Sequence, residues 1–447
     1  MTSHLFEDHS DALLIWQRLG CRELTCVHVD AHLDLMEECF EPDALAALAE
    51  AENLHEFREE AGPFGPLLHC ANYLYPALAI GVVSELIWVV PEKMWDPERP
   101  LRQGQALLDH WLDIPLPDMP SWRIEGGALC GTLLGTPFTL CDSSTLPSLT
   151  NASIALDIDL DYFIDVHTDD VWQTPHQLNE KLNLASPSVL TVATSVDGGY
   201  TPVQELYLGE VCLEVFSGGN GWRQETEELL EADRLPEDRR RDRWEQLLAH
   251  APEPMRPALL SRLGRMEEAQ SCDERYQIKL ENRIARCIEK KDWSRGLALI
   301  DGDEKHPELA LYCHYGEQDW ERVVKSFELL KDVPRRGPTT LKIRQLVGEA
   351  LHRLGRLEES EHIFKRAIEL DPSLPGAYFQ LGRVQMARDR LKPAARSFQK
   401  ALRLSRGRLS SLTLLGEAAR YFQQMGESAL ASTARKELGQ ARRQLVF

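Results

Sequence analysis

The chain has 447 residues, too many for one compact hydrophobic core, so two or more domains are expected. Its hydrophobic content of 43% is ordinary for a globular protein, and no apolar run is long enough to span a bilayer. The first ten residues, MTSHLFEDHS, are unlike a secretory signal, and the ten cysteines form no Cys-x-x-Cys pair. These features predict a cytoplasmic protein without a membrane contact, a zinc knuckle or a disulfide framework.

The net charge of −21 is distributed unevenly along the chain. Residues 1–234 contain 10 Lys and Arg against 40 Asp and Glu, a balance of −30, whereas the rest contains 40 against 31, a balance of +9. A strongly acidic domain attracts metal ions and cationic substrates and repels nucleic acid. If the charge is considered by itself, an acidic surface that keeps the protein in solution is the simpler explanation of this excess.

The front half alternates short apolar runs with helical segments. Helices are expected at 11–20 and 42–60, and the Gly-punctuated stretch 123–142 predicts an antiparallel excursion. Runs that are polar only at their ends suit parallel strands buried on both faces, so a layered α/β sheet is expected. The predicted strands are LTCVHVDA (24–31), ELIWVVP (85–91), ASIALDIDLDYF (152–163) and SVLTVATS (188–195).

The back half repeats with a period of 34 residues. Gly348, Gly382 and Gly416 are spaced at this period, and so are Phe364 and Phe398. This pattern resembles the tetratricopeptide repeat, in which a small residue of the first helix packs against the second helix. About five helix pairs are expected between roughly 250 and 440.

The predicted organisation has three segments. Residues 1–222 form the α/β domain, 223–250 form a charged linker or helix that includes LPEDRRRDRWEQLL, and 251–440 form the repeat domain.

Acidic and imidazole side chains follow two of the predicted strands. Asp30, His32 and Asp34 come after CVHV, while Asp157 and Asp159 come after IAL. Alternate residues of a strand point to the same side, and open α/β sheets place their sites at the carboxyl ends of the strands. Crowded carboxylates repel one another unless cations compensate, and carboxylate with imidazole and no thiolate favours Mn²⁺ or a similar metal. Unrelated surface acids and helix caps are the alternative.

These segments resemble the arginase-like ureohydrolases. Asp30-Ala-His32-Leu-Asp34 matches the DAHxD motif of that family, Leu156-Asp157-Ile-Asp159 matches its second motif, and Asp8-His9-Ser10 matches a third that ends in Asp-His-Ser. The resemblance implies an arginase/deacetylase-like parallel-sheet domain ahead of the all-α repeats. It also implies two Mn²⁺ ions, one held by His9, Asp30, Asp34 and Asp157 and the other by Asp30, His32, Asp157 and Asp159. For His9 the rival interpretation is a helix start capped by Asp8 or Ser10.

Further candidates lie outside these motifs. His69 follows a Gly-containing loop, where the family resemblance implies a proton shuttle, and a buried hydrogen-bonded histidine is the alternative. Asn72 either orients the substrate or caps a turn. The family places a glutamate at the end of a late strand, but here LTVATS ends without one, and Asp197 and Glu205 are the nearest acids. They are the candidate substrate contacts.

The motifs look most like the peptide arginases of ribosomal peptide modification. The resemblance implies hydrolysis of arginine side chains in a precursor peptide to ornithine and urea, with Asp34, Asp159 and His69 moving protons. The repeats are expected to bind a leader peptide or another protein, or to form a homo-oligomer. The alternatives are a ureohydrolase or amidohydrolase of a small free substrate, and a repeat scaffold with an inactive front domain.

Overall fold

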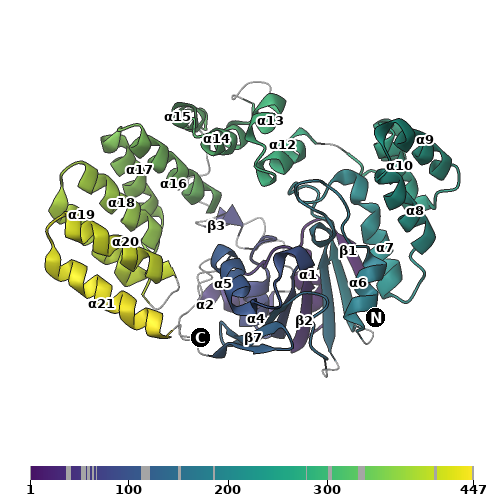
Figure 1. Cartoon of the computed structure of the whole chain (residues 1–447), viewed down its shortest axis with the longest axis horizontal. Helices are drawn as coiled ribbons and strands as arrows, with labels where there is room; N and C mark the ends of the chain where they lie inside the picture. Colours follow the sequence, from purple (N-terminus) through teal and green to yellow (C-terminus); the bar gives the residue numbers. More distant parts are fainter. Residues whose placement is uncertain are drawn as a thin grey trace.

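The computed structural model describes residues 2–36, 42–51, 57, 61–62, 65–66, 68–111, 121–149, 153–184, 187–277, 279–300, 305–330, 338–406 and 410–444. Figure 1 shows a layered α/β part followed by helices that run in consecutive pairs to the end of the chain. This agrees with the predicted α/β region and all-helical back half. No helix in the described ranges is both long and apolar enough to cross a membrane.

An eight-stranded sheet forms the centre of the α/β part, in the order β1-β10-β9-β2-β5-β8-β7-β6. The first six strands in this order, which end with β8, are parallel to one another. The last two, β7 and β6, pair in antiparallel fashion, as predicted for 123–142. Every residue of β2, β9 and β10 is buried, which explains their nearly continuous apolar sequences. The strands are β1 (Thr2–Phe6), β2 (Leu24–Val29), β5 (Val83–Val89), β6 (Arg123–Glu125), β7 (Ala128–Leu133), β8 (Thr136–Cys141), β9 (Ile154–Asp159) and β10 (Val189–Ala193).

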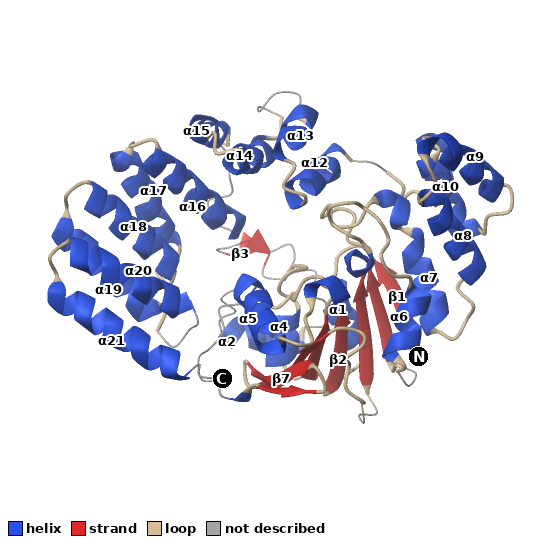
Figure 2. Ribbon diagram, in the orientation of Figure 1, coloured by secondary structure: helices blue, strands red, loops and turns tan. Residues whose placement is uncertain are grey.

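Helices cover both faces of this sheet (Figure 2). One face packs against α1 (Asp11–Arg18), α2 (Pro42–Glu50), α4 (Leu74–Ala79) and α5 (Pro100–Trp111) through one core cluster, which contains Trp16 and Trp88. The other face packs against α6 (Pro175–Leu182) and α7 (Tyr207–Phe216) through a second cluster. A short hairpin of β3 (Ala61–Gly62) and β4 (Gly65–Pro66) lies outside the main sheet.

The second core cluster continues past the sheet into the helices that follow. It includes residues from Val27 to Tyr276 and therefore reaches α8 (Arg223–Asp233), α9 (Glu237–Leu248), α10 (Arg256–Arg262) and α11 (Met266–Cys272). Of the two expectations for 223–250, a charged linker or a helix, the structure shows helices, and their apolar side chains share a core with the sheet.

The remaining helices pair in sequence, and several smaller core clusters lie along them, as expected when each repeat packs on its neighbours. A Cβ atom on Gly348 would lie 2.6 Å from Phe364, and one on Gly382 would lie 2.7 Å from Phe398, so these two glycines permit close helix packing. Leu412 of α20 packs against the core around Trp16. The helices are α12 (Leu280–Glu289), α13 (Trp293–Leu299), α14 (Pro307–Gly316), α15 (Trp320–Leu329), α16 (Pro338–Arg353), α17 (Leu357–Leu370), α18 (Pro375–Ala387), α19 (Leu391–Leu404), α20 (Ser410–Gln424) and α21 (Ser428–Gln444).

Candidate metal centre

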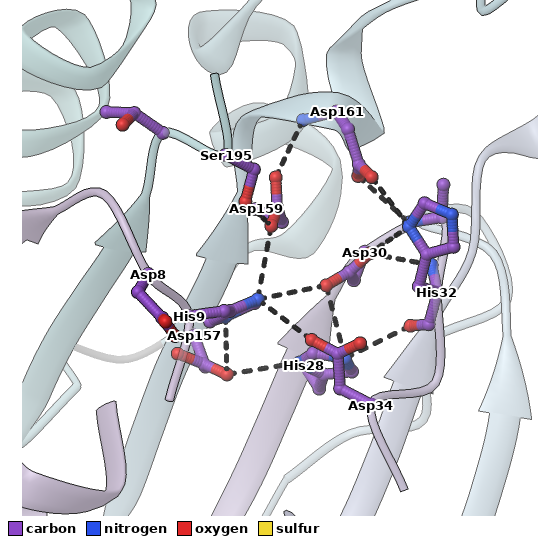
Figure 3. A network of polar contacts seen from close by, with 12 residues as sticks. Asp8, His9, His28, Asp30, His32, Asp34, Asp157, Asp159, Asp161 and Ser195 are labelled. Carbon is purple, nitrogen blue, oxygen red and sulfur yellow. Dashed lines mark hydrogen bonds and ion pairs between the residues drawn. The ribbon is translucent and has the colours of Figure 1, made fainter. Parts of the chain in front are cut away.

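The candidate site lies where the adjacent strands β2 and β9 end. Their parallel register pairs His28 with Asp157 and Val29 with Ile158, so the next residues along the two strands are Asp30 and Asp159. Because side chains alternate along a strand, Asp157 and Asp159 point to the same face of the sheet. Asp157 lies two residues before the end of β9. Figure 3 shows these acids together with His9, which comes from the segment between β1 and α1.

His9 lies at the centre of the first group of ligand-type atoms. Its Nδ1 is 3.2 Å from one carboxylate oxygen of each of Asp30, Asp34 and Asp159, and the imidazole is fully buried. Atoms of His9, Asp30 and Asp34 lie within 4.8 Å of one another, close enough to share one ion. The structure thus brings the predicted His9 to the two strand-end motifs.

Asp30 also belongs to a second such group, with His32 and Asp161. His32 Nδ1 is 2.7 Å from Asp161 and 3.5 Å from Asp30. The His32 side chain is 18% exposed, so this group lies toward the open side of the centre. Asp161 was not among the predicted ligands. The run Asp157-Ile-Asp159-Leu-Asp161 offers two possible Asp-x-Asp pairs, and only the strand register distinguishes them.

Asp157 lies deeper and is saturated with hydrogen bonds. Its Oδ2 faces His9 Nε2 and His28 Nδ1, each at 3.1 Å, and accepts from the Tyr73 hydroxyl at 2.5 Å. Its Oδ1 accepts from the Thr191 hydroxyl at 2.6 Å. His9, His28 and Asp157 also lie within reach of a single ion. However, the four donors around Asp157 suit a carboxylate that orients its neighbours better than one that faces a metal.

His28 has partners on both sides of its ring, as expected for a buried core histidine. Its Nδ1 faces Asp157, while its Nε2 lies 3.1 Å from the backbone carbonyl of His32. It therefore supports the loop that carries the second ligand group.

The carboxylates at the centre crowd one another. Burial raises the pKa of Asp30, Asp34 and Asp159 above the ordinary aspartate value, and neighbouring carboxylates raise it further. The pKa of Asp159 reaches about 6, in part because Asp161 lies nearby. The protein therefore stabilises the charged forms of these three groups poorly by itself, and a cation between them would relieve the repulsion.

The carboxylates of the centre also raise the pKa of its two imidazoles, in this case against the effect of burial. Burial by itself would lower the pKa of His9 and His32, but adjacent carboxylates raise both above the ordinary value. Asp157 is the main such neighbour of His9, and Asp161 is that of His32. The two imidazoles therefore hold their protons more strongly than a free histidine does.

Two ligand-type atoms of the centre remain without a hydrogen bond. Among the described residues, His9 Nδ1 and Asp30 Oδ2 are buried and have no hydrogen-bond partner. His9 Nδ1 is at ion-pair distance from three carboxylates, but none meets it with hydrogen-bond geometry. Buried polar atoms in proteins are almost always paired, so unpaired atoms that face one another fit a bound divalent cation.

Two residues of the loop after β10 also border the centre, and neither was predicted. The Ser195 hydroxyl donates to Asp159 at 2.5 Å. The Tyr200 ring meets the His32 ring edge-on, with centroids 4.8 Å apart. Hydroxyl and aromatic residues in a loop carry no recognisable motif, so only their position identifies them.

The predicted proton shuttle lies on a loop that packs against the DAHLD segment. Asn72 is fully buried, and its side-chain oxygen accepts the backbone N–H of His69 at 3.0 Å. The backbone N–H of Leu74 donates to the carbonyl of Asp34 at 3.2 Å. Of the two roles considered for Asn72, the structure therefore supports the turn cap. A catalytic role for His69 stays a prediction.

The two predicted substrate contacts are occupied by cations of the helical part. Asp197 is bound by Lys279 at 2.7 Å and by Asn282 at 3.0 Å. Glu205 is 3% exposed and pairs with the buried Arg262 at 2.7 Å. Each carboxylate thus pairs with a cation from another segment, and a substrate contact for either one stays a prediction.

Comparison with known proteins identifies one part of the chain. A family model described as "Tetratricopeptide repeat" matches residues 341–374, which include most of α16 and all of α17. No curated protein matches the chain.

Several solved structures resemble the chain weakly. A structure titled "MamA MSR-1 C2" is 18% identical and covers 37% of this chain and 96% of its own, with a TM-score of 0.25. The C-terminal part of a repeat-containing protein from Cytophaga hutchinsonii is 14% identical, covering 50% and 99%, with a TM-score of 0.31. "MamA RS-1 ArsTM double mutant" is 16% identical, covering 46% and 95%, with a TM-score of 0.23. The chain thus contains a tetratricopeptide repeat, and it is the family model that carries this conclusion.

Proposed function

We propose that the α/β part is a metal-dependent hydrolase with a binuclear centre. The observation that carries the proposal is the convergence of buried ligand-type atoms from three separate segments. They are the unpaired atoms of His9 and Asp30, and the carboxylate of Asp161 beside His32. The sequence motifs that resemble those of the arginase-like ureohydrolases support the same conclusion.

The geometry favours a ligand set in which Asp161, which follows β9, replaces Asp157 of that strand. One ion would be held by His9, Asp30, Asp34 and Asp159, and the other by Asp30, His32 and Asp161, with Asp30 shared. Asp157 would instead keep His9 in the tautomer whose Nδ1 lone pair faces the metal, because it engages Nε2.

The ligand atoms are carboxylate oxygens and imidazole nitrogens, which suit Mn²⁺. When bound, two such ions would supply a water whose pKa is lowered towards neutrality. The protein would hold the substrate beside this water and move its protons. Asp34 and Asp159 are the carboxylates available for proton transfer, and His69 would assist from the neighbouring loop.

We infer that the substrate is an arginine side chain within a peptide, converted to ornithine with release of urea. The charge of −30 on residues 1–234 suits a cationic group. The tetratricopeptide repeat supports a macromolecular partner, since such arrays present extended surfaces for binding. A small free guanidine or amide is the alternative substrate of the same centre.

The repeat match also supports a second function, namely a protein-binding scaffold. In this alternative the front domain is inactive. Protein binding by the repeats is also compatible with an active front domain, because a repeat array can bring a peptide to a neighbouring active site.

Metal analysis and mass spectrometry test the proposal. The full chain should bind about two Mn²⁺ ions after metal removal and reconstitution. With an arginine-containing peptide it should then remove about 42 Da per arginine, the mass difference between arginine and ornithine side chains. Less than one ion per chain would support the scaffold alone, whereas urea release from free arginine at equal efficiency would favour the small substrate.

A further inference from the structure

We propose that a cavity between the loop after β10 and helices α12 and α13 binds an acidic segment of a peptide through its carboxylates. The cavity has a volume of about 280 Å³ and is distinct from the metal centre. Its walls combine apolar side chains of Val203 and Leu299 with a set of basic side chains. The volume suits one or two amino-acid side chains.

The basic side chains come from two helices of the repeat part. Arg283, Arg286 and Lys290 are spaced to lie on one face of α12 and the residue after it, while Arg295 lies in α13. The acids among the lining residues are Asp169 and Asp292, so the lining charge is +2. The metal centre, in contrast, is crowded with carboxylates.

Two of the four cations already have partners inside the protein. Arg286 donates to Asp169 at 2.5 Å and to the backbone carbonyl of Tyr200 at 2.6 Å. Lys290 also pairs with Asp169. These contacts fix the wall of the cavity and neutralise Asp169.

The other two cations remain available. Arg283 and Arg295 are exposed, and neither side chain forms an ion pair with any residue in the described ranges. Asp292 accepts the backbone N–H of Arg295, which makes it the cap of α13. A guanidinium binds carboxylate oxygens through paired N–H donors, so two free guanidinium groups at one cavity favour a carboxylate ligand.

An unpaired hydroxyl inside the cavity supports the same ligand chemistry. Thr201 is 2% exposed, and its hydroxyl has no hydrogen-bond partner within the described part of the chain. Buried hydroxyls are normally paired, so this one is suited to donate to an oxygen of a bound group.

The walls of the cavity are held together before any ligand binds. Gly199 lies so close to α12 that a Cβ atom there would be 2.8 Å from Ala285 Cβ. Asp197 is anchored to Lys279 on the same side. A preformed pocket loses little conformational entropy on binding, which favours recognition of a flexible peptide.

The position of the cavity indicates a peptide rather than a free ion. Its loop also carries Tyr200, whose ring contacts His32 at the metal centre. A peptide held here by acidic residues would therefore pass close to the centre that we propose acts on its arginines. The inference rests on the proposed function only for the identity of the peptide, because binding itself needs no metal.

Fluorescence anisotropy of the full chain in EDTA tests this proposal. The probes are a labelled decapeptide of alternating leucine and glutamate and the same peptide with glutamine for glutamate. The glutamate peptide should bind more tightly, and R283E combined with R295E should weaken its binding about tenfold. The milder pair R283Q and R295Q should weaken it less, and circular dichroism should show that both variants are folded.

The matched control reverses two exposed arginines of α9, Arg239 and Arg241, which lie outside the cavity lining. R239E with R241E should leave binding unchanged. The proposal is overturned if the glutamate peptide fails to bind, if both peptides bind equally, or if the cavity variants bind like the wild type. Competition by millimolar inorganic phosphate as strong as that by unlabelled peptide would identify a small-anion pocket instead. Because EDTA removes the metal, loss of hydrolase activity cannot produce any of these results.

Discussion

Asp157 Oδ2 lies 3.1 Å from Nε2 of His9, on the opposite edge of the imidazole from the Nδ1 that faces Asp30, Asp34 and Asp159. One carboxylate thus occupies one ring nitrogen, and a group of carboxylates surrounds the other. This relationship separates a residue that orients a ligand from the residues that would bind the metal.

The first prediction concerns Asp157 and Asp161. D161N should lower the metal content from about two ions per chain to about one, because it removes a ligand of the group with Asp30 and His32. D157N should keep both ions but weaken their binding by about tenfold or more, as expected for a residue that orients a ligand. Inductively coupled plasma mass spectrometry after gel filtration measures both. Two ions in D161N together with one in D157N would restore the assignment made from the motifs.

The second prediction concerns stability and metal removal. Because burial and mutual repulsion raise the pKa of Asp30 and Asp34, Mn²⁺ should stabilise the folded chain. The stabilisation should be about 2.7 kcal/mol at a free metal concentration one hundred times the Kd. Differential scanning fluorimetry with Mn²⁺ and with EDTA measures the change in Tm. D30N with D34N should abolish the difference, and an equal shift in this variant would show that Mn²⁺ binds elsewhere.

The third prediction concerns the buried pair of Glu205 and Arg262. Burial raises the pKa of Glu205 to about 7, although Arg262 acts in the opposite direction. The folded state therefore binds this proton more tightly than the unfolded state, whose carboxyl has the ordinary value of 4.5. The contribution of Glu205 to stability should be present below pH 4.5 and decrease as the pH rises through about 7.

Thermal unfolding of E205Q across this pH range checks the sign. The wild type should lose more stability than E205Q as the pH rises, since glutamine does not titrate. The exposed Glu227 provides the control E227Q, which should follow the wild type. Identical pH profiles of E205Q and the wild type would contradict the prediction.

The fourth prediction concerns close packing in the repeats. G348A should destabilise the repeat part by about 1–3 kcal/mol, because the added methyl group would lie 2.6 Å from Phe364. G439A provides a matched helical control with no atom within 4 Å of the new Cβ, and it should stabilise by about 0.5–1 kcal/mol. Denaturant unfolding followed by circular dichroism measures both. Equal effects of the two substitutions would show that Gly348 is not required for packing.

Local patterns in the sequence were sufficient to predict much of the fold. Strands are confirmed within the predicted ranges 24–31, 85–91, 152–163 and 188–195, although Leu160–Phe163 form a 3-10 helix after β9. Continuous apolar runs are typical of strands that are covered on both faces. The period of 34 residues predicted the repeat that the family model matches at 341–374. For the charged segment 223–250 the sequence left a linker and a helix open. The helices there pack through Leu229 and Leu248 against the core of the sheet, which is distant in sequence, so no local pattern decided between the two.

Some features of the candidate centre could likewise be predicted from local sequence, whereas others depend on contacts between distant segments. The sequence alone determined that acids lie at the carboxyl ends of β2 and β9 and that His32 lies after β2, because motif and strand alternation are local properties. Only the tertiary structure decided that Asp161 contacts His32 while Asp157 contacts His9. These contacts depend on the register between β2 and β9, which are more than 120 residues apart in the sequence. The same holds for Ser195 and Tyr200 beside the centre. Contacts between distant segments depend on how the whole chain packs, and no local pattern encodes them.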